Sequence, residues 1–230
     1  MKSNRPIITL FMLTSLDGKI STGNNNNMDF DKDLPNIKGV KKGLYQYYDL
    51  EKKTDLHSLN TGRVMEKIGV NNKKDPLKSP VSFIVIDNKP HLTEKGVRYM
   101  AKWGQKLYLI TTNKKHPVFS LKDVSNIEII YYPKLILKKV LEDLQKKYKI
   151  ERITIQSGGT MNSAFLREGL IDHLSIVVAP AIVGGKDTST LIDGESLHSK
   201  KDLKNIKALK LVKCNVLKDS YTHLFYDVIN

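Results

Sequence analysis

The strongest constraint on the fold is a short segment in which an apolar run meets two adjacent glycines and then a helical pattern. Ile153-Thr154-Ile155 leads into Gln156-Ser157-Gly158-Gly159-Thr160-Met161-Asn162, and Ala164-Phe165-Leu166 follows. This order predicts a strand, a tight turn and a helix. Because adjacent glycines carry no Cβ, an anion can approach the backbone amides at the helix start. The segment predicts a phosphate or pyrophosphate site, although paired glycines are also common in structural turns.

Apolar runs alternate with helical patterns along the rest of the chain. We expect strands at 7–13, 83–86, 107–111, 127–131, 153–156, 173–179, 210–217 and 222–228. The clearest helical pattern covers 134–148, and weaker ones cover 39–53, 62–69, 92–103 and 160–168. Strands separated by helices predict parallel pairing, while the last two strands predict an antiparallel hairpin. The expected fold class is α/β, with a mixed, mostly parallel sheet flanked by helices and an antiparallel C-terminal hairpin.

Length and composition narrow the class of protein. A chain of 230 residues favours one domain over 1–230. No apolar run approaches the roughly 18 residues of a membrane span, and the first residues lack a secretion signal, so we expect a cytoplasmic protein with no membrane partner. One cysteine, Cys214, excludes an intramolecular disulfide and a cysteine-cluster zinc site. The six histidines lack metal-binding spacing, so no metal is expected.

The net charge of +14 raises the alternative of nucleic-acid binding. Only five of the 38 basic residues are arginines, and the lysines are spread through nearly every segment. Recognition of bases and phosphates favours the planar fork of arginine, so the distribution argues against a nucleic-acid partner. A positive field would still attract a small phosphorylated molecule.

The loop after the first expected strand gathers several polar groups. Thr14-Ser15-Leu16-Asp17-Gly18-Lys19-Ile20 contains two hydroxyls, a carboxylate, a glycine and an ammonium group. Asp17 can accept hydrogen bonds from substrate hydroxyls, and Lys19 can pair with a phosphate. A simple Asp-Gly turn explains the same residues equally well.

Three other loops follow strands or open a helix. Thr61-Gly62-Arg63 predicts a glycine turn with a cation in the first helical turn, where an anion would compensate the unfavourable charge. Asp87-Asn88-Lys89-Pro90 and Thr111-Thr112-Asn113 end two strands. Ligands of open α/β sheets bind beyond the carboxyl ends of strands, so these loops are candidates for a ribose or a phosphate. Ordinary turn chemistry is the alternative.

Four segments together resemble one known family. They are Ser15-Leu16-Asp17-Gly18-Lys19-Ile20, Gln156–Asn162, Leu166–Leu174 and Ala179–Gly185. Their order and spacing resemble the reductase domain of the bifunctional riboflavin-pathway deaminase-reductase, which shares the dihydrofolate reductase fold. The resemblance runs from about residue 7 to 228 and is weakest at roughly 24–60.

The resemblance implies an NADPH-dependent reductase. Its substrate would be a ribosylaminopyrimidine 5′-phosphate, whose ring-opened sugar is reduced to a ribityl chain, and the cofactor would carry the hydride. Asp17 would be catalytic, and Ser15 and Lys19 would contact the substrate. The residues expected to bind the cofactor are Thr14, Gly62, Arg63, Asp87, Lys89, Thr111, Thr112, Gly158, Gly159, Thr160 and Asn162. Members of the family often pair, which suggests a homodimer.

Departures from the family pattern keep an alternative open. Thr61-Gly62-Arg63-Val64-Met65-Glu66 looks more like the Gly-Arg helix start of dihydrofolate reductase itself, with Met65 where a threonine is usual. A dihydrofolate-reductase-like enzyme of other specificity is therefore the second hypothesis, although Trp103 lies far from the first loop and makes folate the weaker choice. The zinc motifs of the companion deaminase are absent, so we expect a reductase without that activity.

Overall fold

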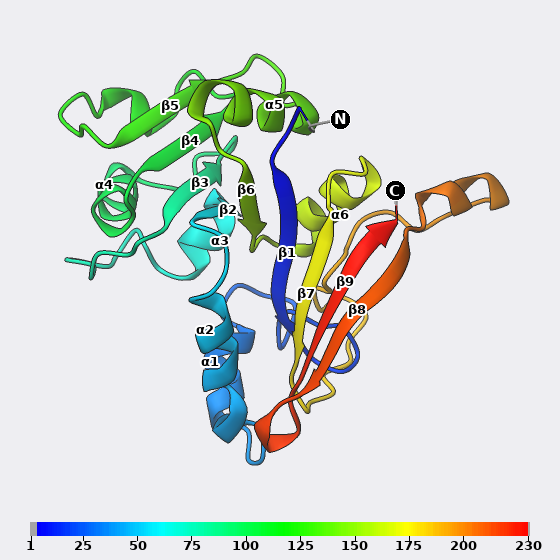
Figure 1. Ribbon diagram of the computed structural model, residues 1–230. Coiled ribbons are helices and arrows are strands. Elements are labelled where there is room, and N and C mark those ends of the chain that lie inside the picture. The colour runs from blue at the N-terminus through cyan, green and yellow to red at the C-terminus, as the bar shows by residue number, and fades with distance from the viewer. Residues whose placement is uncertain (1–3, 230) are drawn as a thin grey trace. The chain divides into compact units, whose positions relative to one another are not determined.

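The computed structural model describes residues 4–229, which form two compact units (Figure 1). The first contains residues 4–6 and Asp55–Ser157, and the second contains Ile7–Thr54 and residues 158–229. One domain over 1–230 stays a prediction. Across residues 4–229, every helix is too short or too polar to span a bilayer.

The first unit is built around a parallel sheet. Its strands are β2 (His57–Thr61), β3 (Ser82–Ile86), β4 (Leu107–Thr111), β5 (Ile127–Tyr131) and β6 (Arg152–Ile155). They lie in the order β5-β4-β3-β2-β6, and each printed pair is parallel. Parallel neighbours need crossover connections, which the intervening helices supply. The parallel pairing predicted from the alternation of patterns is confirmed in this unit.

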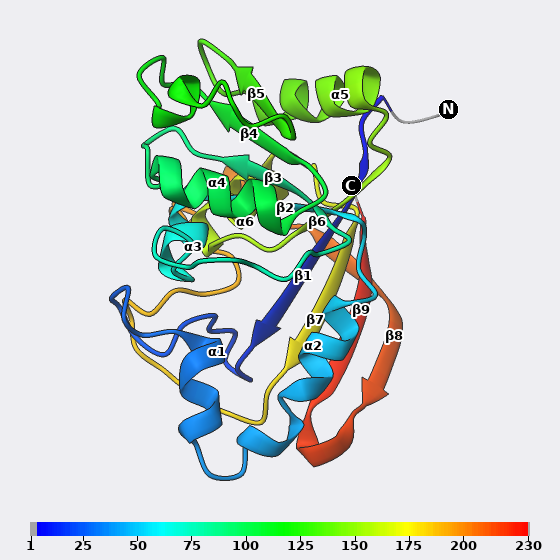
Figure 2. The ribbon, with the colours of Figure 1, turned by 90° about the vertical axis from the view of Figure 1, so that its left-hand side faces the viewer.

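Helices pack on both faces of these strands. They are α3 (Gly62–Lys67), α4 (Glu94–Trp103), η3 (Pro117–Ser120) and α5 (Leu137–Tyr148). Helix α4 lies in front of the strands in Figure 2. Its residue Met100 shares an apolar cluster with Leu107 of β4. The next residue of β4, Tyr108, points to the other face, where its ring meets Tyr148 of α5 edge to face at 5.1 Å.

The second unit contains the antiparallel part of the fold. Its strands are β1 (Ile7–Thr14), β7 (His173–Val178), β8 (Ala208–Val216) and β9 (Thr222–Ile229). They lie in the order β1-β7-β9-β8. β1 and β7 are parallel, whereas β9 is antiparallel to both β7 and β8. The predicted C-terminal hairpin, orange and red in Figure 1, and the predicted mixed α/β fold class are both confirmed.

Helices of the second unit also lie on two faces. They are α1 (Phe30–Asp33), η1 (Leu34–Asn36), η2 (Lys41–Gly43), α2 (Tyr45–Glu51), α6 (Gly159–Arg167), η4 (Lys200–Asn205) and η5 (Lys218–Ser220). Tyr47 of α2 stacks on Phe11 of β1 at 5.1 Å, in a cluster that includes Val177. Leu174 points to the opposite face of β7, where it adjoins Leu166 of α6.

Strand β2 was not among the predicted strands. Its sequence His57-Ser58-Leu59-Asn60-Thr61 contains one strongly apolar residue, yet Ser58 and Asn60 are buried. The Asn60 amide donates to Ser58 Oγ at 3.1 Å, and Ser58 Oγ donates to Gln156 Oε1 at 3.1 Å. Buried polar side chains are tolerated when they bond one another, and a hydrophobicity pattern does not reveal such pairing. The helix predicted at 39–53 was also too long, since η2 and the shorter α2 occupy that region.

Candidate functional site

The start of α6 is the most open of the predicted anion sites. Gly158 is its N-cap residue, at φ −72° and ψ 158°, and no side chain caps the helix. A Cβ placed on Gly158 would have no heavy atom within 4 Å. Among residues 4–229, none accepts a hydrogen bond from the backbone amides of Gly159 or Thr160. Uncapped amides at a helix start favour a bound anion, and the phosphate or pyrophosphate site at this turn stays a prediction.

Gly159 is closely packed, in contrast to Gly158. A Cβ at this position would lie 2.3 Å from Thr190 O and 2.5 Å from Asp193 Oδ2. The Asp193 amide donates to Gly159 O at 3.1 Å, and the buried Asn162 donates from Nδ2 to Leu191 O at 2.9 Å. Only glycine fits at residue 159, because the segment around Thr190 lies directly against its backbone.

Asp17 lies in a network of hydrogen bonds. Its Oδ1 accepts from Ser15 Oγ at 2.6 Å and from the Val183 amide at 3.1 Å, and its Oδ2 accepts from the Gly184 amide at 2.7 Å. These bonds, above all the one from Ser15, lower the pKa of Asp17 to about 2. Near pH 7 the carboxyl of Asp17 is therefore almost entirely ionised. Asp17 is therefore a hydrogen-bond acceptor in this state, and a poor proton donor.

The other residues of this loop also contact protein groups. Lys19 Nζ donates to Gly185 O at 2.7 Å and to Thr188 O at 3.0 Å. Ser15 is buried, and its Oγ accepts from the Lys19 amide at 2.9 Å. Thr14 is also buried, and its carbonyl accepts from the Ala179 amide. The structure brings Ser15, Asp17 and Lys19 together, as a junction between two loops.

In the first unit, a buried carboxylate organises the loop after β3. Asp87 accepts hydrogen bonds from the Leu92 amide at 2.9 Å and from both the amide and the ring of His91. His116 Nε2 lies 3.1 Å from Asp87 Oδ2. Burial raises the pKa of Asp87, but the hydrogen bonds from His116, Leu92 and His91 outweigh it, and the net pKa lies below its usual value. These contacts give the carboxylate a structural role, and its expected contact with the cofactor stays a prediction.

Gly62 and Thr111 adjoin the same carboxyl group. A Cβ on Gly62 would lie 2.2 Å from Asp87 Cγ, so this glycine leaves room for the buried carboxylate. The buried Thr111 donates from Oγ1 to Asp87 O at 2.8 Å, and the Thr112 amide donates to Asn88 Oδ1 at 3.0 Å. The structure therefore brings Gly62, Asp87 and Thr111 together.

The two predicted cations of the first unit, Arg63 and Lys89, are exposed. Arg63 lies in the first turn of α3, whose N-cap Thr61 accepts from the Val64 amide at 3.4 Å. Lys89 follows β3, two residues after Asp87. The role of both side chains as cofactor contacts stays a prediction.

Sequence reasoning missed the residues that support these turns. His91 and His116 fix Asp87, and Thr190 and Asp193 support Gly159. The spacing of Asp87 and His91, four residues apart after a strand, was an available signal for the first group. No local pattern connects Gly159 with residues about 30 positions later, because that contact depends on the fold.

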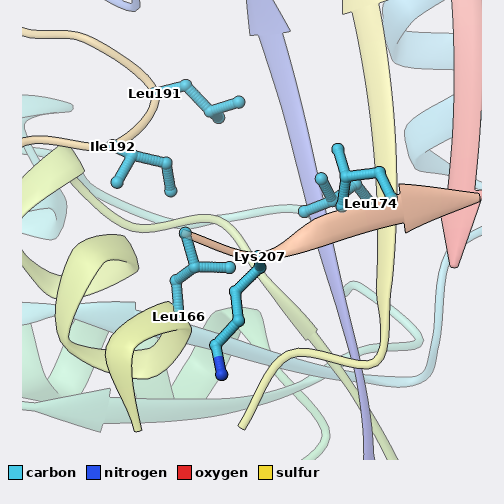
Figure 3. A pocket seen from close by; sticks show the side chains of 6 residues that line it. Leu166, Leu174, Leu191, Ile192 and Lys207 are labelled. Carbon is cyan, nitrogen blue, oxygen red and sulfur yellow. The ribbon is translucent and has the colours of Figure 1, made fainter. Parts of the chain in front are cut away.

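An apolar pocket of about 200 Å³ lies elsewhere in the second unit (Figure 3). Its lining residues are Leu166, Leu174, Leu191, Ile192, Lys207 and Leu209. Reaction sites combine apolar walls with several convergent polar groups, whereas this lining offers one lysine. We therefore do not assign the reaction to this pocket.

Comparison with protein families identifies the family of this chain. The family model described as "RibD C-terminal domain" matches residues 6–222. The chain belongs to the RibD C-terminal domain family. The chain is similar to the 2,5-diamino-6-ribosylamino-4(3H)-pyrimidinone 5′-phosphate reductase of Methanothermobacter thermautotrophicus. The two sequences are 41% identical over 73 residues, which are 32% of this chain and 30% of that protein. The enzyme of the same name from Archaeoglobus fulgidus is 29% identical over 92 residues, 40% of this chain and 42% of that protein.

These alignments span less than half of each relative, so the sequence similarity covers only part of each protein. Solved structures extend the similarity in fold over the whole chain. Acinetobacter baumannii RibD matches 99% of this chain and 59% of its own, at a TM-score of 0.69 and 18% identity. The riboflavin biosynthesis reductase Rib7 of Saccharomyces cerevisiae matches 100% of this chain and 92% of its own, at a TM-score of 0.64 and 13% identity. The RibD reductase-domain fold expected from the sequence motifs is therefore confirmed.

Proposed function

We propose that this RibD-family chain is a nicotinamide-dependent reductase of riboflavin biosynthesis. Its substrate is a ribosylaminopyrimidine 5′-phosphate, and its product carries a ribityl chain. Family membership and the reductases named above support the reaction class. The observation that carries the proposal is the uncapped start of α6, where the amides of Gly159 and Thr160 have no acceptor among residues 4–229.

The proposed cofactor is NADPH. Its pyrophosphate accepts hydrogen bonds from the Gly159 and Thr160 amides, because a helix start attracts negative charge. Gly158 leaves open space above these amides. NADPH is proposed in preference to NADH because its additional 2′-phosphate is drawn more strongly to a chain with a net charge of +14.

The protein contributes orientation and electrostatics to this reaction. When bound, the reduced nicotinamide supplies a hydride to C1′ of the ring-opened sugar, and a proton completes the reduction. Asp17 is ionised near pH 7 and accepts hydrogen bonds from Ser15 and from the Val183 and Gly184 amides, so we do not assign that proton to it. The net positive charge of +14 favours the approach of a substrate and a cofactor that both carry phosphates.

The direct test is an assay of the purified protein with the pyrimidine phosphate and either NADPH or NADH. We expect loss of the absorbance of the reduced nicotinamide and a product that is heavier by two hydrogens. NADPH should give the higher kcat/KM. Lack of turnover with both cofactors would contradict the proposal.

Two parallel reactions distinguish the alternatives. Dihydrofolate in place of the pyrimidine phosphate tests a dihydrofolate-reductase-like enzyme of other specificity. Binding to DNA or RNA with a steep salt dependence would favour the basic nucleic-acid-binding protein. We expect neither, since the lysines are dispersed and the helix start fits a small anion.

A further inference from the structure

The loop that contains Asp17 is tied to a second loop by both side chains and backbone. Asp17 accepts from the Val183 and Gly184 amides, and Lys19 Nζ donates to Gly185 O and Thr188 O. The two residues thus bind opposite kinds of backbone group, amides and carbonyls. Such paired contacts fix a loop in position as well as in orientation.

Backbone hydrogen bonds continue the same junction. The Ile20 amide donates to Ser189 O at 3.0 Å, and the Leu191 amide donates to Gly18 O at 2.9 Å. Lys19 and Thr190 also form an antiparallel β-bridge. Residues 183–193, which we call the strap, are therefore held along their length by residues 17–20.

The far end of the strap supports the first turn of α6. Thr190 O and Asp193 Oδ2 occupy the space where a Cβ of Gly159 would lie. The Asp193 amide donates to Gly159 O at 3.1 Å, and Asp193 Oδ1 accepts from the Thr190 amide at 2.9 Å and from its hydroxyl at 2.7 Å. The position of Gly159 is thus set by the strap, and the strap by residues 17–20.

We infer that Asp17 and Lys19 are positioning residues that act through the strap on the cofactor-binding amides of Gly159 and Thr160. The inference rests on the proposed function, because it takes the ligand of these amides to be the cofactor pyrophosphate. Asp17 and Lys19 serve cofactor affinity, and the hydride-transfer step depends on them little. The hydrogen bonds from the Val183 and Gly184 amides explain the position of Asp17 without a proton-transfer role.

The chemistry of Asp17 agrees with this role. The Ser15 hydroxyl and the two strap amides hold the pKa of its carboxyl at about 2. A proton donor needs a pKa near the working pH, whereas an acceptor of three hydrogen bonds needs a stable negative charge. Asp17 meets the second requirement.

The test compares Asp17→Asn and Lys19→Met with matched substitutions on the strap. Asp187→Asn and Lys186→Met change the same residue types at exposed positions for which the described residues provide no hydrogen bond or ion pair. The dissociation constant of NADPH is measured by titration, and kcat is measured at saturating NADPH with the pyrimidine phosphate. Thermal unfolding of every variant separates loss of fold from loss of binding.

We expect Asp17→Asn and Lys19→Met each to weaken NADPH binding about tenfold, the equivalent of about 1.4 kcal/mol. Their kcat at saturation should stay within about threefold of wild type, and the two strap controls should match wild type in both quantities. Lys19→Met keeps the test decisive if Asp17→Asn does not fold.

Three results would overturn the inference. One is a loss of about 100-fold in kcat at saturating NADPH with unchanged affinity, which would place Asp17 at the reacting atoms. Another is a lowered unfolding temperature with unchanged NADPH affinity, which would limit the junction to stability. The third is wild-type protein that binds neither NADPH nor NADH, and this result alone would reject the proposed function as well.

Discussion

Two glycine turns in this protein open helices after strands, yet only one is left open. At the start of α3, the Thr61 hydroxyl caps the helix, and the Asp87 carboxylate fills the space beside Gly62. At the start of α6, no side chain caps the helix, and nothing lies within 4 Å of a Cβ built on Gly158. The same sequence signal therefore marks a protein-filled turn in one unit and a ligand-accessible turn in the other.

The difference shows what a glycine at a helix start can mean. A side chain at Gly62 would collide with the buried Asp87 carboxylate, and a side chain at Gly159 would collide with the strap. Of these three glycines, only Gly158 has no protein neighbour that explains the absence of a side chain. A glycine with no packing explanation, next to uncapped amides, is the better indicator of a binding site.

The largest expected change in stability follows removal of the Asp87 carboxylate. Asp87→Ala leaves the donors of His91, Leu92 and His116 without an acceptor in a buried site, which should lower the free energy of unfolding by about 3–5 kcal/mol. Denaturant unfolding measures this change. Asp123→Ala removes an exposed partner of Arg98 and should change stability little. Equal effects of the two variants would contradict a structural role for Asp87.

The next largest difference in stability is expected when alanine replaces the glycine of each turn. Gly62→Ala places a Cβ 2.2 Å from Asp87 Cγ and should lower the free energy of unfolding by about 1–3 kcal/mol. Gly158→Ala adds the same atom in open space at an ordinary backbone conformation, and should change stability by less than about 0.5 kcal/mol. Denaturant unfolding of both variants checks the pair. A stable Gly62→Ala would show that the Asp87 site is not tightly packed.

The contribution of Asp87 to the free energy of unfolding should depend on pH. Because its folded pKa lies below the unfolded value, the stability it contributes is present above about pH 4 and is lost as pH falls through the folded pKa. The difference in unfolding free energy between wild type and Asp87→Asn should therefore narrow below about pH 4. Unfolding measured at several pH values tests the sign. A difference that widens in acid would contradict the lowered pKa.

The smallest expected effect concerns the open turn. Gly158→Ser introduces a capping hydroxyl at a residue whose backbone already has N-cap geometry, and should raise stability by a few tenths of a kcal/mol. The hydroxyl should also compete with the cofactor for the free amides, so NADPH should bind more weakly. Titration with NADPH and denaturant unfolding together test whether stability rises while NADPH affinity falls. Improved binding with improved stability would contradict competition for the amides.

Much of the fold was predictable because its strands are apolar and its helices amphipathic. The β7 and β9 runs and the α5 pattern led directly to observed elements. Strand β2 was not predictable in this way, since its buried Ser58 and Asn60 depend on hydrogen bonds between side chains. One of these bonds joins residues about 100 positions apart in the sequence, Ser58 and Gln156.

The geometry of a turn was predictable where a local motif determines it. The open turn at Gly158 follows from two glycines between a strand and a helix. The role of Asp87 was not predictable, because a carboxylate after a strand is equally suited to a ligand or to the buried donors of His91 and His116. The support of Gly159 by Thr190 and Asp193 likewise depends on contacts that only the folded chain creates.

The most direct test of the central claim is the backbone amide signal of Gly159 and Thr160 in nuclear magnetic resonance spectra recorded during addition of NADPH. These amides have no acceptor among residues 4–229, so we expect both resonances to shift as the pyrophosphate binds. The amide of Leu166, near the other end of α6, should move much less. Saturation of the protein with NADPH while the signals of Gly159 and Thr160 stay in place would contradict the account.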